Sequence, residues 1–124
     1  MTRFKRTKCN CEECPLRDRK RVYGLAEAEK FSVAIIGEAP GAEEDARGEP
    51  FVGASGAKLK EAVALSGMLW HLVYRTNVLL CRPTDNDIDG AEGQEALECC
   101  KPGFEEEIEW LERIKLRLLC RLEM

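Results

Sequence analysis

The chain has 124 residues, 44% of them apolar and 34% charged, which is typical of a single soluble globular domain. No apolar run approaches the roughly 20 residues of a membrane-spanning helix. The beginning, MTRFKRTKCNCEEC, lacks the apolar region of a secretory signal, so we expect a cytoplasmic protein. Residues 1–22 hold eight Lys and Arg against three acids, so this end carries +5 and the rest −9. Such a basic end either contacts nucleic acid or is a solvated tail.

The first part of the chain is expected to be irregular. Residues 1–10 are predicted to form a flexible basic arm, and residues 11–124 the folded domain. FSVAII, residues 31–36, is an apolar, β-branched run that predicts a buried strand. The stretch GEAPGAEEDARGEPFVGASG, from Gly37 to Gly56, follows it and predicts a heavily specified, acidic loop. A phosphate-binding loop would instead need a lysine at the start of a helix.

The next elements continue the alternation of strand and helix. Ser55 is the expected N-cap of a helix that runs through Leu65, and Gly67 suits its C-terminal end. LVYRTNVLLC, residues 72–81, predicts a second strand because it is rich in β-branched and aromatic residues. A polar loop is expected over residues 82–93.

A second helical pattern runs from Gln94 to Ile114, with an expected interruption at Pro102-Gly103. LRLLCRLEM, residues 116–124, reads as a third strand that has barely begun. The order of elements predicts an α/β fold, a Rossmann-like three-layer α/β/α arrangement with a parallel sheet, truncated after about two strands and two helices.

Seven cysteines are many for a cytosolic protein, where disulfides are disfavoured, so clustered thiols indicate metal binding or redox chemistry. CEEC separates Cys11 and Cys14 by two residues, and a second pair comprises Cys81 with Cys99 or Cys100. The wide spacing of that second pair fits an iron–sulfur cluster better than a zinc ribbon.

The other thiols have simpler interpretations. Cys120 lies in an apolar run and is expected to be a buried core residue. Cys9 and one member of the adjacent pair Cys99 and Cys100 are surplus to a four-cysteine site.

Four motifs occur in a fixed order: CEECPL, the Gly37–Gly56 loop, YRTNVLLCRP and CKPGF. Together they resemble the family-4, iron–sulfur uracil-DNA glycosylases, a group that includes phage proteins described as related to DNA polymerase. The resemblance extends from residue 11 to about residue 115. It implies DNA base-excision repair, in which the N-glycosidic bond of a flipped deoxyuridine is hydrolysed.

The resemblance also assigns a base pocket to the glycine-rich loop. Gly37, Glu38 and Ala39 would line it, and Phe51 would stack on the uracil ring. Asn77 would read the uracil edge, because its amide can accept from N3–H and donate to O4 at once. Cytosine presents the reverse pattern, so discrimination requires the amide to be held in one orientation.

The acidic residues of the loop have open roles. Glu38 either positions a catalytic water or braces the loop as a structural acceptor. Glu44 and Asp45 match the family's acidic pair and are expected to shape the loop through hydrogen bonds to backbone groups.

The resemblance implies a structural 4Fe-4S cluster held by Cys11, Cys14, Cys81 and Cys100. Cys100 is chosen over Cys99 because CKPGF matches the family's Cys-x-Pro pattern, although the longer loop after Cys81 keeps both open.

One family signature, a late His-Pro-Ser motif, does not occur here, and the single histidine, His71, matches no motif. We therefore expect little glycosylase activity from this chain alone, and a second polypeptide as the source of the remaining half. Uracil-containing DNA is the expected substrate. The alternative function is a non-catalytic iron–sulfur or zinc module that binds nucleic acid or a partner protein.

Overall fold

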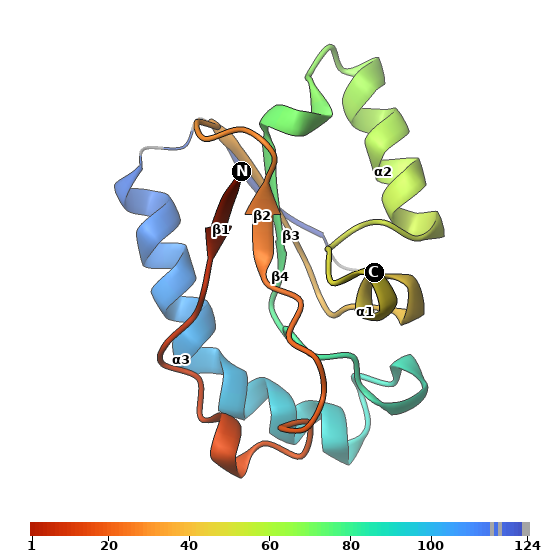
Figure 1. The fold of residues 1–124 in the computed structure, drawn as a ribbon, viewed down its shortest axis with the longest axis vertical. Helices are drawn as coiled ribbons and strands as arrows, with labels where there is room; N and C mark the ends of the chain where they lie inside the picture. Colours follow the sequence, from red (N-terminus) through yellow and green to blue (C-terminus); the bar gives the residue numbers. More distant parts are fainter. Residues whose placement is uncertain (115, 117, 123–124) are drawn as a thin grey trace.

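The computed structural model describes residues 1–114, 116 and 118–122, and its centre is a twisted sheet (Figure 1). The sheet has five strands in the order β1-β2-β4-β3-β5. The strands are β1 (Thr2–Phe4), β2 (Gly24–Ala26), β3 (Val33–Gly37), β4 (Val73–Asn77) and β5 (Leu118–Arg121). The helices are α1 (Ala42–Arg47), α2 (Ala54–Leu65) and α3 (Ala91–Arg113), with short 3-10 turns η1 (Cys11–Glu13), η2 (Trp70–Leu72) and η3 (Thr84–Asn86).

The parallel part of the sheet agrees with the prediction. β3 pairs in parallel with β4 on one side and with β5 on the other. The paired ends of β3 and β4 place Gly37 directly opposite Asn77. In sheets of this kind ligands bind beyond the carboxyl ends of the strands, so this register marks the edge where a site is expected.

The prediction of about two strands was wrong, because the N-terminal segment adds two more. β1 and β2 pair antiparallel with one another, and β2 pairs antiparallel with β4, which makes the sheet mixed. Each of these strands has three residues, which is too short to show an alternating hydrophobic pattern.

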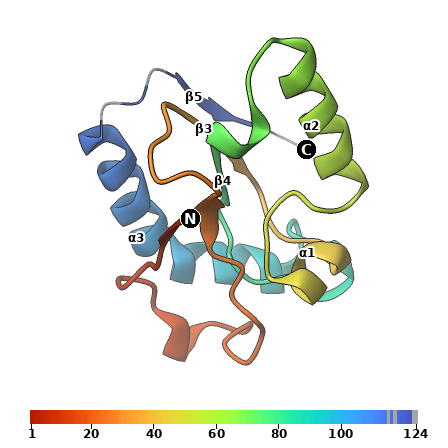
Figure 2. The ribbon, with the colours of Figure 1, turned by 45° about the horizontal axis from the view of Figure 1, so that its top comes forward.

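Helices cover both faces of the sheet, as the three-layer prediction requires (Figure 2). On one face α2 contributes Val63, which packs with Ile35 and Val73. On the other face α3 contributes Leu111, which packs with Tyr74 among the buried residues there. The two cores share the parallel strands, whose side chains alternate between the faces.

The expected break in the second helix does not occur, because α3 continues through Pro102. Proline removes one helical hydrogen bond, but buried residues on both sides of it, Cys100 and Leu111 among them, fasten the helix to the fold. Tertiary packing therefore outweighs the local preference.

Two other boundaries differ from the prediction. The N-cap of α2 is Gly53, so Ser55 lies inside the first turn. β4 ends at Asn77, four residues before Cys81, because its neighbour β3 ends at Gly37. Beyond that point the Val78 N–H donates to the Gly37 carbonyl at 2.9 Å, so the chain follows the loop and leaves the strand ladder.

The prediction of a flexible arm at residues 1–10 was also wrong. Thr2–Phe4 form the edge strand β1, and Arg6 is only 7% exposed. Positive charge indicates solvation when read from the sequence, but the Arg6 guanidinium is paired with the buried Glu107 carboxylate at 2.8 Å.

The expected third strand exists as β5, which pairs with β3. Three residues of the predicted segment, Arg117, Glu123 and Met124, lie outside the described residues. Within the described ranges, no helix combines the length and apolar character needed to cross a membrane.

Candidate functional site

Three residues predicted to contact a base meet at the carboxyl end of the parallel strands. A Cβ atom on Gly37 would overlap the Asn77 side-chain oxygen and would lie 2.6 Å from the Phe51 ring. Only glycine permits this approach. The fold therefore brings Gly37, Phe51 and Asn77 together, although Phe51 comes from the far end of the loop.

Asn77 is held firmly through its backbone. It is 3% exposed, it is the last residue of β4, and its main-chain carbonyl accepts from the Arg6 guanidinium at 2.5 Å. Within the described part of the chain, the hydrogen bonds found at Asn77 involve its backbone only. The strand end is thus held in place, while the carboxamide keeps its donors and acceptor for a ligand.

Phe51 adopts an uncommon backbone conformation. Its φ angle is +58°, in the left-handed region that a bulky residue rarely occupies. The ring is 8% exposed and packs with Ile35 and Val63. Gly56, in the first turn of α2, presses against the Phe51 main chain, where any Cβ would overlap it. Such local strain persists when the surroundings impose it, and it is frequent at binding sites.

Glu44 braces the glycine-rich loop. Its carboxylate accepts hydrogen bonds from the backbone N–H groups of Gly41 at 3.0 Å, Val52 at 2.9 Å and Gly53 at 2.6 Å. This agrees with the predicted role of Glu44 in shaping the loop. The structure gives Asp45 no comparable role: its N–H makes the ordinary helical hydrogen bond to the Gly41 carbonyl at 2.9 Å, and no hydrogen bond to its carboxylate is found among the described residues.

Glu38 and Ala39 line a neighbouring hollow, and the sequence did not predict the residues on its other side. Its other side comes from the loop after β4, which contributes Pro83, Asn86 and Ile88 among others. Asn86 has a φ angle of +59°, and the run of Asp and Asn residues there was the available signal for a tight turn.

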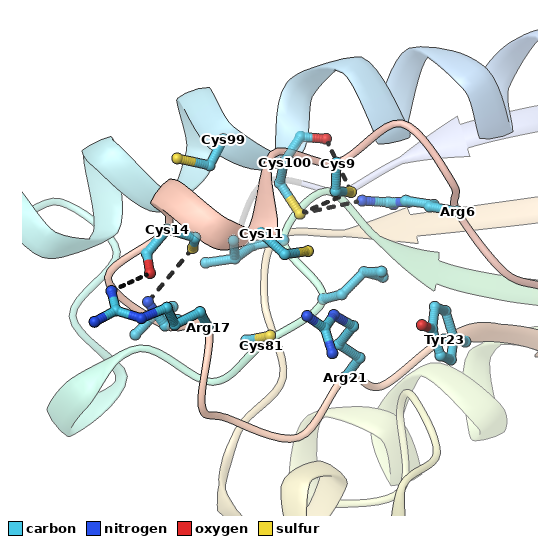
Figure 3. A pocket seen from close by; sticks show the side chains of 13 residues that line it. Arg6, Cys9, Cys11, Cys14, Arg17, Arg21, Tyr23, Cys81, Cys99 and Cys100 are labelled. Atoms are coloured by element: carbon cyan, nitrogen blue, oxygen red, sulfur yellow. Dashed lines mark hydrogen bonds between the residues drawn. The ribbon is translucent and has the colours of Figure 1, made fainter.

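The second candidate site is a hollow lined by thiols (Figure 3). It lies between η1, the segment after β4 and α3. Its cysteines come from three distant parts of the chain: Cys9, Cys11, Cys14, Cys81, Cys99 and Cys100. The structure thus gathers all four residues predicted as cluster ligands, together with the two cysteines judged surplus near them.

The two adjacent cysteines of α3 differ in orientation. The Cys100 sulfur points into the hollow, and the Cys99 sulfur, whose residue also lines the hollow, points in a different direction (Figure 3). Cys9, judged surplus from the sequence, places its sulfur 3.7 Å from that of Cys100. A Cβ on Gly103 would overlap the Cys9 sulfur, so this glycine leaves room for the thiol beside α3.

The pKa values of the cysteines in the hollow are shifted in opposite directions. Burial raises the pKa of Cys81 to about 12. The hydrogen bond from the Cys9 thiol, aided by the Arg6 guanidinium, lowers the pKa of Cys100 to about 6. Arg17 and Arg21 also line the hollow, so positive charge is at hand for thiolates, which are the metal-binding form of cysteine.

The thiols surround a space and do not converge on a point. Among the described residues, no three Cys, His, Asp or Glu side chains stand close enough to hold a single metal ion. A four-iron cluster takes one thiolate at each of four separate corners. Thiolates ligate both zinc and iron–sulfur clusters, so the donor set is of the kind that either would use.

Fold and site together define a class. Residues 24–121 match the model of the Uracil DNA glycosylase superfamily, so the chain belongs to that superfamily. It is 44% identical over 94 residues to the Type-4 uracil-DNA glycosylase of Pyrobaculum aerophilum, covering 75% of this chain and 46% of that protein.

Two further relatives carry the same name. Identity to the Type-4 uracil-DNA glycosylase of Archaeoglobus fulgidus is 47% over 79 residues, 62% of this chain and 39% of that protein. For the Thermotoga maritima protein of that name it is 38% over 87 residues, 69% of this chain and 45% of that protein. The resemblance inferred from the motifs is confirmed, and the matched part spans less than half of each relative.

Proposed function

We propose that this chain provides the base-recognition part of a uracil-DNA glycosylase acting in DNA base-excision repair. The observation that supports it best is the meeting of Gly37, Phe51 and Asn77 at the carboxyl end of the parallel strands. Each residue supplies a different need of a flipped base: close backbone approach, an aromatic surface and an amide that reads the edge.

Discrimination would come from the Asn77 amide. Its oxygen accepts from uracil N3–H and its NH₂ donates to uracil O4. The Gly37 backbone lies close to the amide oxygen, and the proposal requires the amide to keep this one orientation, since the reversed amide would serve cytosine. A wrong base would leave buried polar groups unpaired, which is costly.

The proposed reaction is hydrolysis of the N-glycosidic bond of deoxyuridine in DNA. The bond between C1′ and N1 breaks and uracil leaves with the electron pair. A water oxygen then bonds to C1′, and the proton that this water loses balances the one taken up by the uracil anion. We assign Glu38 the role of orienting that water, because it directly follows Gly37 at the end of β3 and lines the neighbouring hollow. Phosphate contacts from the exposed basic residues would make DNA binding sensitive to salt.

We propose that Cys11, Cys14, Cys81 and Cys100 hold a 4Fe-4S cluster. The thiol-lined hollow and the inward direction of the Cys100 sulfur support this choice. When bound, the cluster would serve as a structural cross-link between η1, the segment after β4 and α3. The end of β4 that carries Asn77 would be held by protein hydrogen bonds, such as those from Arg6 to the Asn77 and Val78 carbonyls.

A partner for the sheet is a further part of the proposal. Among the described strands, β5 has a neighbour on one side only. Its Leu118 is 50% exposed and Leu119 is 42% exposed. An open strand edge with apolar side chains is suited to pairing with another strand, and we propose that a second polypeptide supplies it.

Binding of single-stranded oligonucleotides with one uracil or one thymine tests the function, with released uracil measured in parallel. We expect the wild-type chain to prefer uracil and Asn77→Ala to lose that preference. His71→Ala, which changes an exposed residue outside the site, should behave as wild type. A wild-type chain that binds both oligonucleotides equally would contradict the proposal.

Anaerobic purification with iron and sulfide assays tests the cluster. We expect a brown protein whose iron content falls in Cys11→Ser and persists in Cys120→Ser, since Cys120 packs in the core beside β3 and not in the thiol hollow. A colourless chain that binds only zinc and shows no uracil preference would support the non-catalytic module instead.

A further inference from the structure

Arg6 connects the two candidate sites. It lies outside the segment that matches the superfamily model, yet it is 7% exposed and its guanidinium meets acceptors on several sides. Nη1 donates to the Val78 carbonyl at 2.7 Å and to the Cys100 sulfur at 3.6 Å, while Nη2 donates to the Asn77 carbonyl at 2.5 Å.

The other side of the guanidinium is fixed by Glu107. Nε donates to Glu107 Oε1 at 2.8 Å, and both side chains are at most 1% exposed. The same carboxylate accepts from Thr76 Oγ1 at 3.2 Å and from the Tyr74 hydroxyl at 2.5 Å. Burial next to this carboxylate raises the pKa of Tyr74, so the phenol stays a donor.

A buried ion pair is a poor source of stability, because desolvation of both charges offsets their attraction. The presence of the Arg6–Glu107 pair is better explained by the groups that it positions. The rigid, planar fork of arginine holds several acceptors in fixed relative places, which the single ammonium of lysine cannot do.

We propose that Arg6 is a positioning residue that couples the thiol hollow to the base-reading end of β4. One guanidinium nitrogen contacts Cys100 and the Val78 carbonyl, and the other contacts the Asn77 carbonyl. Because the group moves as a unit, fixing Cys100 on a bound cluster fixes the peptide that carries Asn77. The part of this inference that concerns uracil rests on the proposed function.

The junction between β4 and the glycine-rich loop reports on this coupling directly. The amide of Val78 donates to the Gly37 carbonyl and that of Leu79 to the Glu38 carbonyl, both at 2.9 Å. Hydrogen exchange of these two amides therefore measures how often the junction opens, with no reference to DNA or activity.

The experiment compares exchange before and after anaerobic reconstitution with ferrous iron and sulfide. In the wild-type chain we expect reconstitution to slow exchange at Val78 and Leu79 about tenfold. Arg6→Met should bind iron but show no such slowing. Lys5→Met, which changes an exposed cation on the same segment, should match the wild type.

Arg6→Lys guards against a variant that fails to fold, because lysine keeps the charge opposite Glu107 without the fork. It should fold, bind iron, and lack the slowing. Equal slowing in the Arg6 variants and the wild type would overturn the coupling, and so would a wild-type chain that takes up no iron or shows no slowing.

Uracil binding separates this inference from the proposed function. If the wild-type chain prefers uracil, Arg6→Lys should reduce the preference while leaving the iron content unchanged. If the wild-type chain shows no preference, the proposed function fails, and the exchange result still decides whether Arg6 couples the two sites.

Discussion

The glycine-rich loop and the thiol hollow are built by opposite means. The loop is braced within itself, because one carboxylate, that of Glu44, gathers N–H groups from both of its ends. The hollow depends on segments far apart in the chain, which bring Cys11, Cys81 and Cys100 to one place. The conformation of the glycine-rich loop is therefore encoded locally, whereas the thiol site requires the assembled fold.

Removal of Glu107 should have the largest effect, because this carboxylate joins side chains from distant segments of the chain. Glu107→Ala leaves the buried Arg6 charge unpaired, along with the Tyr74 hydroxyl. We expect the free energy of unfolding to fall by about 3–5 kcal/mol in urea titrations. Glu109→Ala, at an exposed position of the same helix, should change it by less than about 0.5 kcal/mol.

Loss of the Glu44 carboxylate should destabilise the glycine-rich loop and leave the thiol hollow intact. Glu44→Ala deprives three backbone N–H groups of their acceptor, and we expect a loss of about 1–3 kcal/mol. Amide exchange should quicken in the loop while the iron content stays normal. Glu43→Ala is the matched control, since the polar contact found for that exposed carboxylate among the described residues is the 4.0 Å approach to Arg47. Equal effects of the two variants would contradict the bracing role.

A methyl group at Gly37 tests whether the base-contacting residues form one pocket that is separate from the thiol hollow. In Gly37→Ala the added Cβ displaces the Asn77 amide and the Phe51 ring, whose ends can shift. We expect a stability loss of about 1–2 kcal/mol with abolished preference for the uracil oligonucleotide and unchanged iron content. Retained preference would show that these three residues do not form the pocket.

The smallest expected effect comes from the second buried arginine, Arg75, which pairs with Glu27 at 2.7 Å. The hydrogen bond from Arg75 holds the pKa of Glu27 below its ordinary value of 4.5. A carboxyl whose pKa is lowered by folding stabilises the protein above the unfolded pKa and loses that contribution as pH falls.

Glu27→Gln should therefore be less stable than the wild type near pH 7, by no more than about 1 kcal/mol because Glu27 is 43% exposed. The difference should shrink as the pH falls below 4.5. Urea titrations at several pH values measure it, and a difference that does not depend on pH would contradict the ion pair as its cause.

The sequence by itself determined the local features. The local features are the apolar run of β3 and the glycines and Glu44 of the loop. Their interactions span few residues, so the sequence predicts them directly. The CEEC spacing indicated a thiol site, and four motifs together indicated the superfamily, which the comparisons confirm.

Only the tertiary structure decided the features that depend on distant partners. Strands β1 and β2 form because they pair with the sheet. Helix α3 continues through Pro102 because both of its halves pack against the fold, and Arg6 is buried because it pairs with Glu107. No local sequence pattern predicts such contacts, since their free energy arises only when remote segments meet. The link that Arg6 makes between the thiols and Asn77 belongs to this second kind.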